Sequence, residues 1–480
     1  MQELQDKIKA LNKVSGKLEP SQDQRQGLIT EAHSFADSFL AKVASMPTYS
    51  GASVDRDMSI KAEAIPLSQL LDLFKTEVTE KGIQPASAGH LGYIPGGGLY
   101  ASALADYLVG VTNEYAGVHF ASPGAVAIEH AVLDWLKAVF SFPTSAVGNL
   151  TSGGSIANLI ALTAARDKYG IKNELIPKSV IYLSEQVHHC IQKALRIIGL
   201  EDVIIREIPL DEEFRLQPQV IAEAIAADRA AGLNPFMVIA SAGTTDTGVV
   251  DPLKALGELC QAEGLWYHID AAYGGFFILL EQTKALFDGI ALADSLVVDP
   301  HKGLFIPYGV GAVLVKDKAA VMHSNHYTAN YMQDTISDAH PLNPADVSPE
   351  LSKHFRGLRV WLPLQLYGLE VFKACLEEKL LLTHYMRQKL TDLGFEIGPE
   401  PDLSVSYFWY PHPTDPNGFN QRLMDALMAD GDVFLSSTRL NGRFVIRIAL
   451  LSFRTKLETV DRAVRMIERC LRNVEFGNVE

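Results

Sequence analysis

Cysteine is scarce in this chain of 480 residues, and the four cysteines lie far apart. None belongs to a CxxC pair, so the sequence predicts neither a disulfide framework nor a zinc site, and we expect no bound metal. We expect Cys190, Cys260, Cys375 and Cys470 to be reduced thiols that are mostly buried.

A secretory leader, a long apolar run and a basic surface are also missing. The N-terminus lacks the basic-then-apolar pattern of a signal peptide, and no apolar run approaches the roughly 20 residues of a membrane span. We therefore predict a soluble, cytoplasmic protein that does not bind membranes. The formal net charge of −15, with no basic block, argues against nucleic acid as a partner.

The chain has enough apolar sequence for a large core. With 480 residues, of which 48% are hydrophobic, it is expected to form two or three domains. We predict an N-terminal helical segment at residues 1–87, a large domain at 88–376 and a small α+β domain at 377–480. In the first segment, Leu28, Phe35 and Phe39 fall roughly on one helical face.

One stretch, residues 294–303 (Asp-Ser-Leu-Val-Val-Asp-Pro-His-Lys-Gly), carries the residues best suited to chemistry. Its apolar run is short and β-branched, which predicts a strand, and Pro300 prevents that strand from continuing in the middle of a sheet. Lys302 therefore follows the carboxyl end of a strand, where open α/β sheets bind ligands. A lysine there can form a Schiff base with a carbonyl compound, although a lysine taken alone is more often simply exposed.

Two further predicted strands end in polar residues. The apolar run at 265–269 leads into Asp270, and the run at 236–240 leads into a small, hydroxyl-rich turn that contains Thr245. The carboxyl ends of parallel strands meet at one edge of a sheet, so a lysine, a carboxylate and a threonine converge there. Pyridoxal phosphate needs such a set, namely an amine for the Schiff base, an anion for the pyridine nitrogen and a donor to its oxygens.

The order and spacing of five segments resemble those of a known family, the pyridoxal-phosphate-dependent group II amino acid decarboxylases, which include the aromatic-L-amino-acid and glutamate decarboxylases. The segments are residues 151–155 (Thr-Ser-Gly-Gly-Ser), 184–188 (Ser-Glu-Gln-Val-His), 242–245 (Ala-Gly-Thr-Thr), 268–273 (His-Ile-Asp-Ala-Ala-Tyr) and 299–302 (Asp-Pro-His-Lys). The resemblance implies an α/β, PLP-dependent transferase-like fold (fold type I). Such a fold has a mostly parallel central sheet flanked by helices and a small α+β C-terminal domain.

The resemblance also gives roles to the residues that would hold the cofactor. The turn at Gly153, Gly154 and Ser155 precedes a helix that we expect to begin near residue 156, and it would present free N–H groups to the phosphate. His188, rather than the adjacent His189, would stack on the pyridine ring. The other residues expected at the cofactor are Thr245, Asp270, Ala272, His301 and Lys302.

Residues for the substrate are implied in the same way. Tyr93, Gly96 and Gly97 lie in a loop that matches the family's substrate-pocket loop, with glycines in place of bulkier residues. Gly303 likewise replaces the tryptophan that commonly follows the lysine. Arg447, predicted within a strand, should have an anionic partner, and it matches the arginine that takes the substrate carboxylate. A structural ion pair is the alternative.

A second subunit is implied by two segments. His119 and Phe120 fall in a stretch that family members contribute to the neighbouring subunit's active site, and the N-terminal helices of the family wrap the partner. We therefore expect a homodimer with shared active sites.

The polar stretch at 322–349 has no apolar periodicity and predicts a long loop. The resemblance implies that this loop closes over the substrate and that its tyrosine returns a proton to Cα. Tyr331 aligns best, and Tyr327 is the alternative. Further on, the pattern predicts a helix from about 350 to 393, a strand at 405–410, a helix at 420–428, a hairpin turn at Asn441 and Gly442, and a helix at 457–471.

Together these residues predict α-decarboxylation of an L-amino acid to its amine and CO₂. An aromatic substrate is slightly favoured over an acidic one. An aminotransferase or carbon–sulfur lyase of the same fold, and a catalytically silent binding protein, are the alternatives. The residues expected to take part in catalysis are Lys302, Asp270, His188, Tyr331 and Thr245.

Replacing Tyr331 by phenylalanine tests the predicted proton donor. Tyr331→Phe keeps the ring but removes the acidic proton, so amine formation should fall by about 10²-fold or more while substrate binding changes little. Carbonyl products should rise, and both products can be quantified by chromatography. Tyr327→Phe is the matched control. A normal amine yield in Tyr331→Phe with the loss in Tyr327→Phe would move the role to Tyr327, and normal yields in both would remove it from this loop.

Overall fold

The computed structural model describes residues 1–326 and 342–477. Both tyrosines considered as proton donors, Tyr327 and Tyr331, lie outside the described residues. The helices are α1 (Gln2–Ser15), α2 (Gln22–Leu40), α3 (Leu67–Phe74), α4 (Tyr100–Thr112), α5 (Pro123–Val139), α6 (Gly154–Lys168), α7 (Cys190–Ile197), α8 (Pro218–Ala230), α9 (Leu253–Glu263), α10 (Pro300–Gly303), α11 (Lys318–Asn325), α12 (Gly357–Tyr367), α13 (Leu369–Asp392), α14 (Pro416–Asp430) and α15 (Leu457–Phe476). The strands are β1 (Tyr49–Ser50), β2 (Gly82–Ile83), β3 (Val147–Thr151), β4 (Ser179–Leu183), β5 (Ile204–Glu207), β6 (Asn234–Ser241), β7 (Trp266–Asp270), β8 (Ser295–Val298), β9 (Gly311–Val315), β10 (Glu396–Ile397), β11 (Val405–Trp409), β12 (Ser436–Leu440) and β13 (Arg443–Ala449).

A seven-stranded sheet forms the centre of the large domain, with strand order β3-β9-β8-β7-β6-β4-β5. Its neighbouring strands pair in parallel, except that β9 runs antiparallel to both β3 and β8. The strands predicted from the apolar runs before Lys302, Asp270 and Thr245 are β8, β7 and β6, and they lie side by side. The mostly parallel sheet is therefore confirmed.

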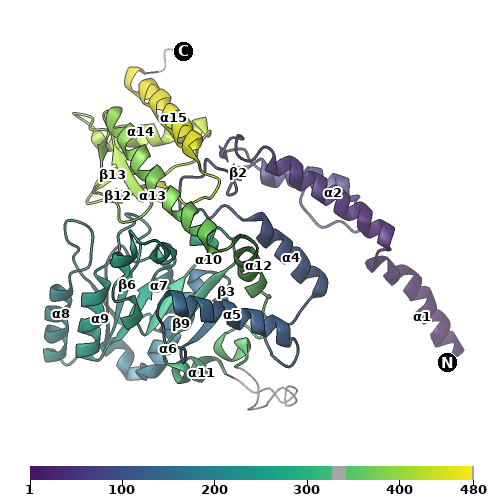
Figure 1. The fold of residues 1–480 in the computed structure, drawn as a ribbon, viewed down its shortest axis with the longest axis horizontal. Coiled ribbons are helices and arrows are strands. Elements are labelled where there is room, and N and C mark those ends of the chain that lie inside the picture. Colours follow the sequence, from purple (N-terminus) through teal and green to yellow (C-terminus); the bar gives the residue numbers. More distant parts are fainter. Residues whose placement is uncertain (327–341, 478–480) are drawn as a thin grey trace.

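Helices cover both faces of this sheet, because its strands are apolar on both sides (Figure 1). Along β4, Val180 and Tyr182 join one core, whereas Ile181 and Leu183 join the other. The first core is completed by α5, α8 and α9, and the second by α6, α7 and α11. The arrangement has three layers, helix–sheet–helix, with the loops at the carboxyl ends of the parallel strands facing the small domain.

The small domain is built on a four-stranded antiparallel sheet of order β10-β11-β13-β12. The hairpin between β12 and β13 turns at Asn441 and Gly442, whose φ angles of +50° and +77° confirm the predicted type I′ geometry. The helices α14 and α15 and the second half of α13 pack on this sheet.

The predicted boundary between residues 376 and 377 falls inside α13, which both domains share. Leu376 and Leu380 belong to the core of the large domain, whereas Leu382 and Met386 belong to that of the small domain. The single helix predicted from about 350 to 393 is wrong, since α12 ends at Tyr367 and Gly368, with a φ of +72°, separates it from α13.

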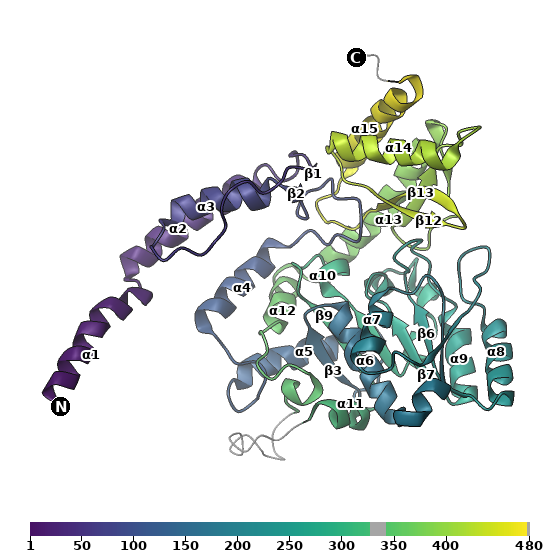
Figure 2. The ribbon, with the colours of Figure 1, turned by 180° about the vertical axis from the view of Figure 1, so that it is seen from behind.

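The N-terminal segment carries helices, as predicted, but contributes no buried side chain from α1, α2 or α3. Figures 1 and 2 show α1 and α2 extending away from the rest of the chain. Residues 51–66 between β1 and α3 are irregular rather than helical. The segment is thus an arm rather than a folded unit.

Two predicted boundaries were wrong by one helical turn or less. The helix expected near residue 156 begins at Gly154, and the long loop expected from residue 322 begins later, because α11 continues to Asn325. In α11 the Asp317 side chain caps the helix by accepting a hydrogen bond from Ala320 N.

All four cysteines are free thiols, and Cys375 is the one that is only half-buried. Within the described residues, no helix is long and apolar enough to cross a membrane, and no group of three His, Cys, Asp or Glu side chains is placed to hold a metal. The cytoplasmic location stays a prediction.

Candidate active site

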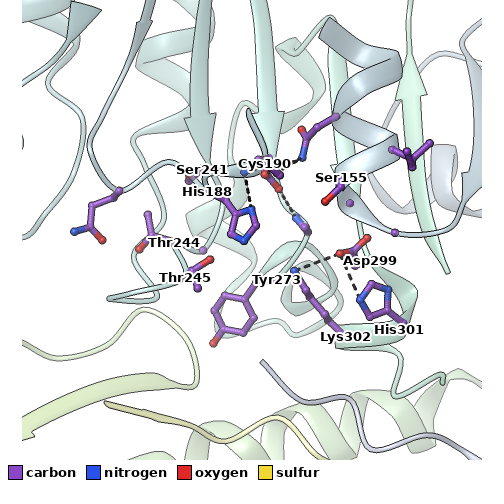
Figure 3. A pocket seen from close by; sticks show the side chains of 18 of the residues that line it. Ser155, His188, Cys190, Ser241, Thr244, Thr245, Tyr273, Asp299, His301 and Lys302 are labelled. Atoms are coloured by element: carbon purple, nitrogen blue, oxygen red, sulfur yellow. Dashed lines mark hydrogen bonds and ion pairs between the residues drawn. The ribbon is translucent and has the colours of Figure 1, made fainter. Parts of the chain in front are cut away.

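A cavity of about 260 Å³ lies at the carboxyl ends of the parallel strands, where the sequence predicts the site (Figure 3). Its walls come from the turns that follow β3, β4, β6, β7 and β8, so five segments distant in sequence meet there. The cavity is lined by Ser152, Gly153, Gly154, Ser155, Ile156, Asn158, Gln186, His188, Cys190, Ser241, Gly243, Thr244, Thr245, Asp270, Ala272, Tyr273, Asp299, His301 and Lys302.

Lys302 reaches the cavity from the short helix α10. Pro300 occupies the first turn of that helix, where a missing N–H costs nothing, and the chain reverses directly after β8. Lys302 Nζ lies 3.3 Å from Asp299 Oδ2, and His301 Nε2 lies 3.7 Å from the same oxygen. His301 Nδ1 lies 2.7 Å from the Val310 carbonyl, which can only accept, so Nδ1 carries the proton.

Asp270 ends β7 and is 8% exposed, with its carboxylate on the cavity wall. Its Oδ1 accepts a hydrogen bond from Ala272 N at 3.0 Å, and its Oδ2 accepts one from Asn158 Nδ2 at 3.1 Å. Each carboxylate oxygen can accept more than one hydrogen bond, so these two contacts leave acceptor capacity for a ligand. A buried carboxylate supplied with two donors suits a cationic or N–H-bearing group in the cavity.

The turn before α6 makes an anion-binding cradle. The first N–H groups of this 15-residue helix have no partner within the helix, and they face the cavity at Gly154 and Ser155. A side chain is excluded at Gly154, because its Cβ would lie 2.9 Å from Asp299 Oδ2. A larger residue is excluded at position 311 as well, since a Cβ added to Gly311 would lie 2.5 Å from the Gly153 carbonyl carbon.

His188 and Thr245 line the cavity, whereas His189 does not. Burial lowers the pKa of His188, opposed by the charge of Asp270, and the ring Nδ1 accepts a hydrogen bond from Cys190 N at 3.2 Å. The Thr244 hydroxyl is used inside its own turn, 2.7 Å from Thr247 Oγ1. Thr245 is therefore the better placed of the two to contact a ligand, as predicted.

The residues present fit pyridoxal phosphate at every part of that molecule. The α6 cradle and Ser155 suit its phosphate, Lys302 its aldehyde and Asp270 its pyridine nitrogen. Asp299 Oδ1 is buried with no hydrogen-bond partner among the described residues, and it lies behind the cradle. Every residue predicted to contact the cofactor lines this one cavity.

The residues predicted for the substrate do not line the cavity in the single chain. Gly96 packs on the backbone of α10, where a Cβ would lie 2.1 Å from the His301 carbonyl oxygen. Gly97, with a φ of +98°, packs on Ser452. Gly96 is therefore required by a backbone contact and Gly97 by its positive φ and its side-chain neighbours, and they do not by themselves show an enlarged substrate pocket.

Arg447 is 3% exposed and makes no ion pair with a carboxylate among the described residues, although the charge of Asp246 opposes the lowering of its pKa by burial. Its guanidinium instead donates to Ser436 Oγ at 2.8 Å and to the Tyr93 carbonyl at 3.2 Å, while Nε has no partner. Tyr93 itself is 57% exposed and has a φ of +50°. Arg447 thus holds the loop that carries Tyr93.

Three other predicted positions lie away from the cavity lining. His119 N donates to Asn343 Oδ1 at 2.8 Å, and the Phe120 ring is exposed at the surface. Gly303 is buried against Phe276, whose Cβ a side chain would approach to 2.8 Å. The space beside Gly303, where many relatives have tryptophan, is therefore filled by the core.

Sequence reasoning missed Asn158, the residue that holds Asp270. The available signal was its position as a polar residue within the apolar run that follows the glycine turn, one helical turn after Gly154. Asp299 and Tyr273 were recognised as parts of motifs, but no role was assigned to them. Both line the cavity, and the Tyr273 hydroxyl lies 2.9 Å from Ser404 Oγ in the small domain.

Comparison with known proteins decides the family. The pyridoxal-dependent decarboxylase conserved domain matches residues 47–411. The chain belongs to this family. It is a pyridoxal-phosphate-dependent amino acid decarboxylase of group II, and its cofactor is pyridoxal phosphate.

Individual relatives of this decarboxylase differ in their substrates. The chain is 34% identical to an aromatic-L-amino-acid decarboxylase of Bacillus atrophaeus over 81% of its length and 82% of the relative's. It is 28% identical to an L-2,4-diaminobutyrate decarboxylase of Acinetobacter baumannii over 85% of its length and 83% of the relative's. The crystal structure of Oryza sativa TDC with PLP and tryptamine superposes with a TM-score of 0.90 at 24% identity, covering 96% of this chain and 99% of that one, and the fold is type I.

Removing Lys302 should abolish covalent attachment of the cofactor. In Lys302→Ala, borohydride reduction should leave no cofactor mass on the protein, and turnover should fall by about 10³-fold or more, as for other lost nucleophiles. Mass spectrometry of the reduced protein checks this, with Lys318→Ala, an exposed lysine on α11, as control. A reduced cofactor adduct that persists in Lys302→Ala would assign the attachment to another lysine.

Proposed function

We propose that this decarboxylase acts on an L-amino acid with an aromatic side chain. The observation that carries the proposal is the similarity to an aromatic-L-amino-acid decarboxylase over 81% of the chain. Lys302 is also the one lysine or arginine among the described residues that line the cofactor cavity. A second carboxylate on the substrate would need a cationic partner, typically arginine.

When bound, pyridoxal phosphate supplies a ring that takes up the electron pair left at Cα as CO₂ departs. Lys302 would hold it covalently, and the free N–H groups of the α6 turn would hold its phosphate. Asp270 would accept a hydrogen bond from the protonated ring nitrogen, since an adjacent anion favours the protonated form. His188 would lie against the ring and exclude water from one of its faces.

Arg447 and Tyr331 complete the proposal on the substrate side. Arg447 is buried beside the Tyr93 loop, and its unpaired Nε gives it capacity for one more hydrogen bond, which suits a substrate carboxylate. Tyr331 would return the proton to Cα. Thr245 would donate to a cofactor oxygen from the turn after β6.

Substrate choice is tested by steady-state kinetics with a panel of amino acids. The aromatic acids tryptophan, tyrosine and DOPA should give kcat/KM values at least about tenfold above those of glutamate, aspartate, cysteine sulfinate and 2,4-diaminobutyrate. A tenfold ratio corresponds to about 1.4 kcal/mol of selective transition-state binding. CO₂ and amine are measured together, so a transamination would be recognised by keto-acid consumption without CO₂. Faster turnover of an acidic or diamino substrate would overturn the proposal.

We also propose that the enzyme is a homodimer with shared active sites. The α1 helix exposes Leu4, Ile8 and Leu11 along one face, each about half exposed, at 55%, 48% and 59%. Such a stripe is costly in water and typical of an interface. Phe120, 61% exposed, lies in the segment proposed to reach the partner's site.

Polar substitutions on the α1 stripe should weaken the dimer. Replacing Leu4, Ile8 and Leu11 together by glutamine removes three side chains that would each contribute about 1.5–3 kcal/mol when fully buried, so the dimer Kd should rise by at least about 100-fold. Sedimentation velocity measures it. The control carries Lys9→Gln and Lys13→Gln on the opposite face of the helix. A dimer Kd in the triple variant equal to that of the wild-type protein would show that the interface lies elsewhere.

A further inference from the structure

Three polar residues of β7 lie on the same face of the sheet and form a line that ends at the site. Trp266, His268 and Asp270 alternate along the strand, so all three side chains point toward α6. His268 is 0% exposed and pairs in register with Ser295 on β8. A buried histidine between a tryptophan and a catalytic carboxylate needs partners on both ring nitrogens.

The hydrogen bonds along this line have one consistent direction, which begins at Asp270. A carboxylate only accepts, so the Asn158 amide must turn its Nδ2 toward Asp270 Oδ2, at 3.1 Å. Asn158 Oδ1 then faces His268 Nε2 at 2.7 Å, and because Oδ1 only accepts, Nε2 carries the ring proton. The second Nδ2 hydrogen faces Cys190 Sγ at 3.4 Å.

The far end of the line is compatible with the same tautomer. Trp266 Nε1 can only donate, and it lies 2.8 Å from Ser295 Oγ. Ser295 Oγ accepts this hydrogen bond, and its own hydrogen stays available for His268 Nδ1, also at 2.8 Å. Burial lowers the pKa of His268 to about 4, which keeps the ring neutral. The Asn158 end of the line thus requires a neutral His268 with its proton on Nε2, and the Ser295 end fits that tautomer.

We propose that the chain Trp266–Ser295–His268–Asn158 is a positioning device that holds an N–H donor against Asp270 and thereby keeps the proton on the ring nitrogen of the bound cofactor. Hydrogen bonds to the ionised form of a carboxylate favour that form. Without the donor, Asp270 becomes more basic and takes the proton from the ring nitrogen. Without His268, Asn158 Oδ1 loses the donor that helps to hold the amide in place against Asp270.

Trp266, Ser295 and His268 do not line the cavity, so their effect reaches the cofactor only through Asn158 and Asp270. The inference rests on pyridoxal phosphate as the cofactor and not on the proposed aromatic substrate. Two measurements without substrate separate the two proposals: the Kd of the apoenzyme for pyridoxal phosphate, and the ¹⁵N chemical shift of its labelled ring nitrogen in the holoenzyme.

A matched pair of substitutions at position 268 tests the direction of the chain. Glutamine places an amide nitrogen where imidazole Nε2 lies, whereas asparagine reaches only the position of Nδ1. His268→Gln should keep the cofactor Kd within about threefold of wild type. His268→Asn should weaken binding by about 10- to 100-fold, the range for a lost hydrogen bond to a charged group, and should move the ¹⁵N shift toward the unprotonated value.

Asn158→Leu should move the ¹⁵N shift in the same direction, and Ser295→Ala should do so to a smaller extent. The control is Tyr182→Phe on β4, away from the cavity, which removes a buried hydrogen bond of 2.9 Å to Asp228 of α8. This control should lower thermal stability without changing the cofactor Kd or the ¹⁵N shift. Equal cofactor Kd values for His268→Gln and His268→Asn, or a wild-type ¹⁵N shift in Asn158→Leu, would overturn the proposal and leave the chain a purely structural one.

Discussion

The structure depends on the burial of one carboxylate at the end of a central strand. Taking Asp270 out of water costs several kcal/mol unless donors replace the lost hydration. Those donors come from the turn after β7 and from α6, which lies in the helical layer above the sheet. The helix that supplies Asn158 also begins with the glycine turn, so one rigid element sets both the phosphate end and the ring-nitrogen end of the site.

The second constraint is the close approach of backbone segments around the site. It explains the glycines near Asp299 and His301 better than the size of the substrate does. Gly154 and Gly311 let the turn before α6 lie directly on Asp299. Gly96 lets the loop from the N-terminal side lie on the carbonyl of His301, next to Lys302. Arg454 holds the same loop from the small domain through the Ala86 and Gly97 carbonyls. The lysine is therefore held by segments of both domains.

The site could be predicted from the sequence to the extent that its residues follow strands. Lys302, Asp270 and Thr245 each come shortly after an apolar run. Parallel strands bring such positions together at one edge of the sheet, and this does not depend on the other parts of the fold. Asn158 and His268 could not be assigned in this way, because their importance arises from packing between α6 and β7. The packing of Gly303 on Phe276 could not be predicted either, because these two residues are distant in sequence.

The helix α13 has a consequence for how this chain can be divided. Phe372, Leu376 and Leu380 pack in the large domain, whereas Met386 and Leu390 pack in the small one, along a single uninterrupted helix. A chimera that exchanges the C-terminal domain with a relative's would join two half-helices selected for different cores. Recombination points within α13 would therefore create cavities or clashes on one side, and an exchange that begins at Gly368, where the backbone already breaks, has to retain Phe372, Leu376 and Leu380.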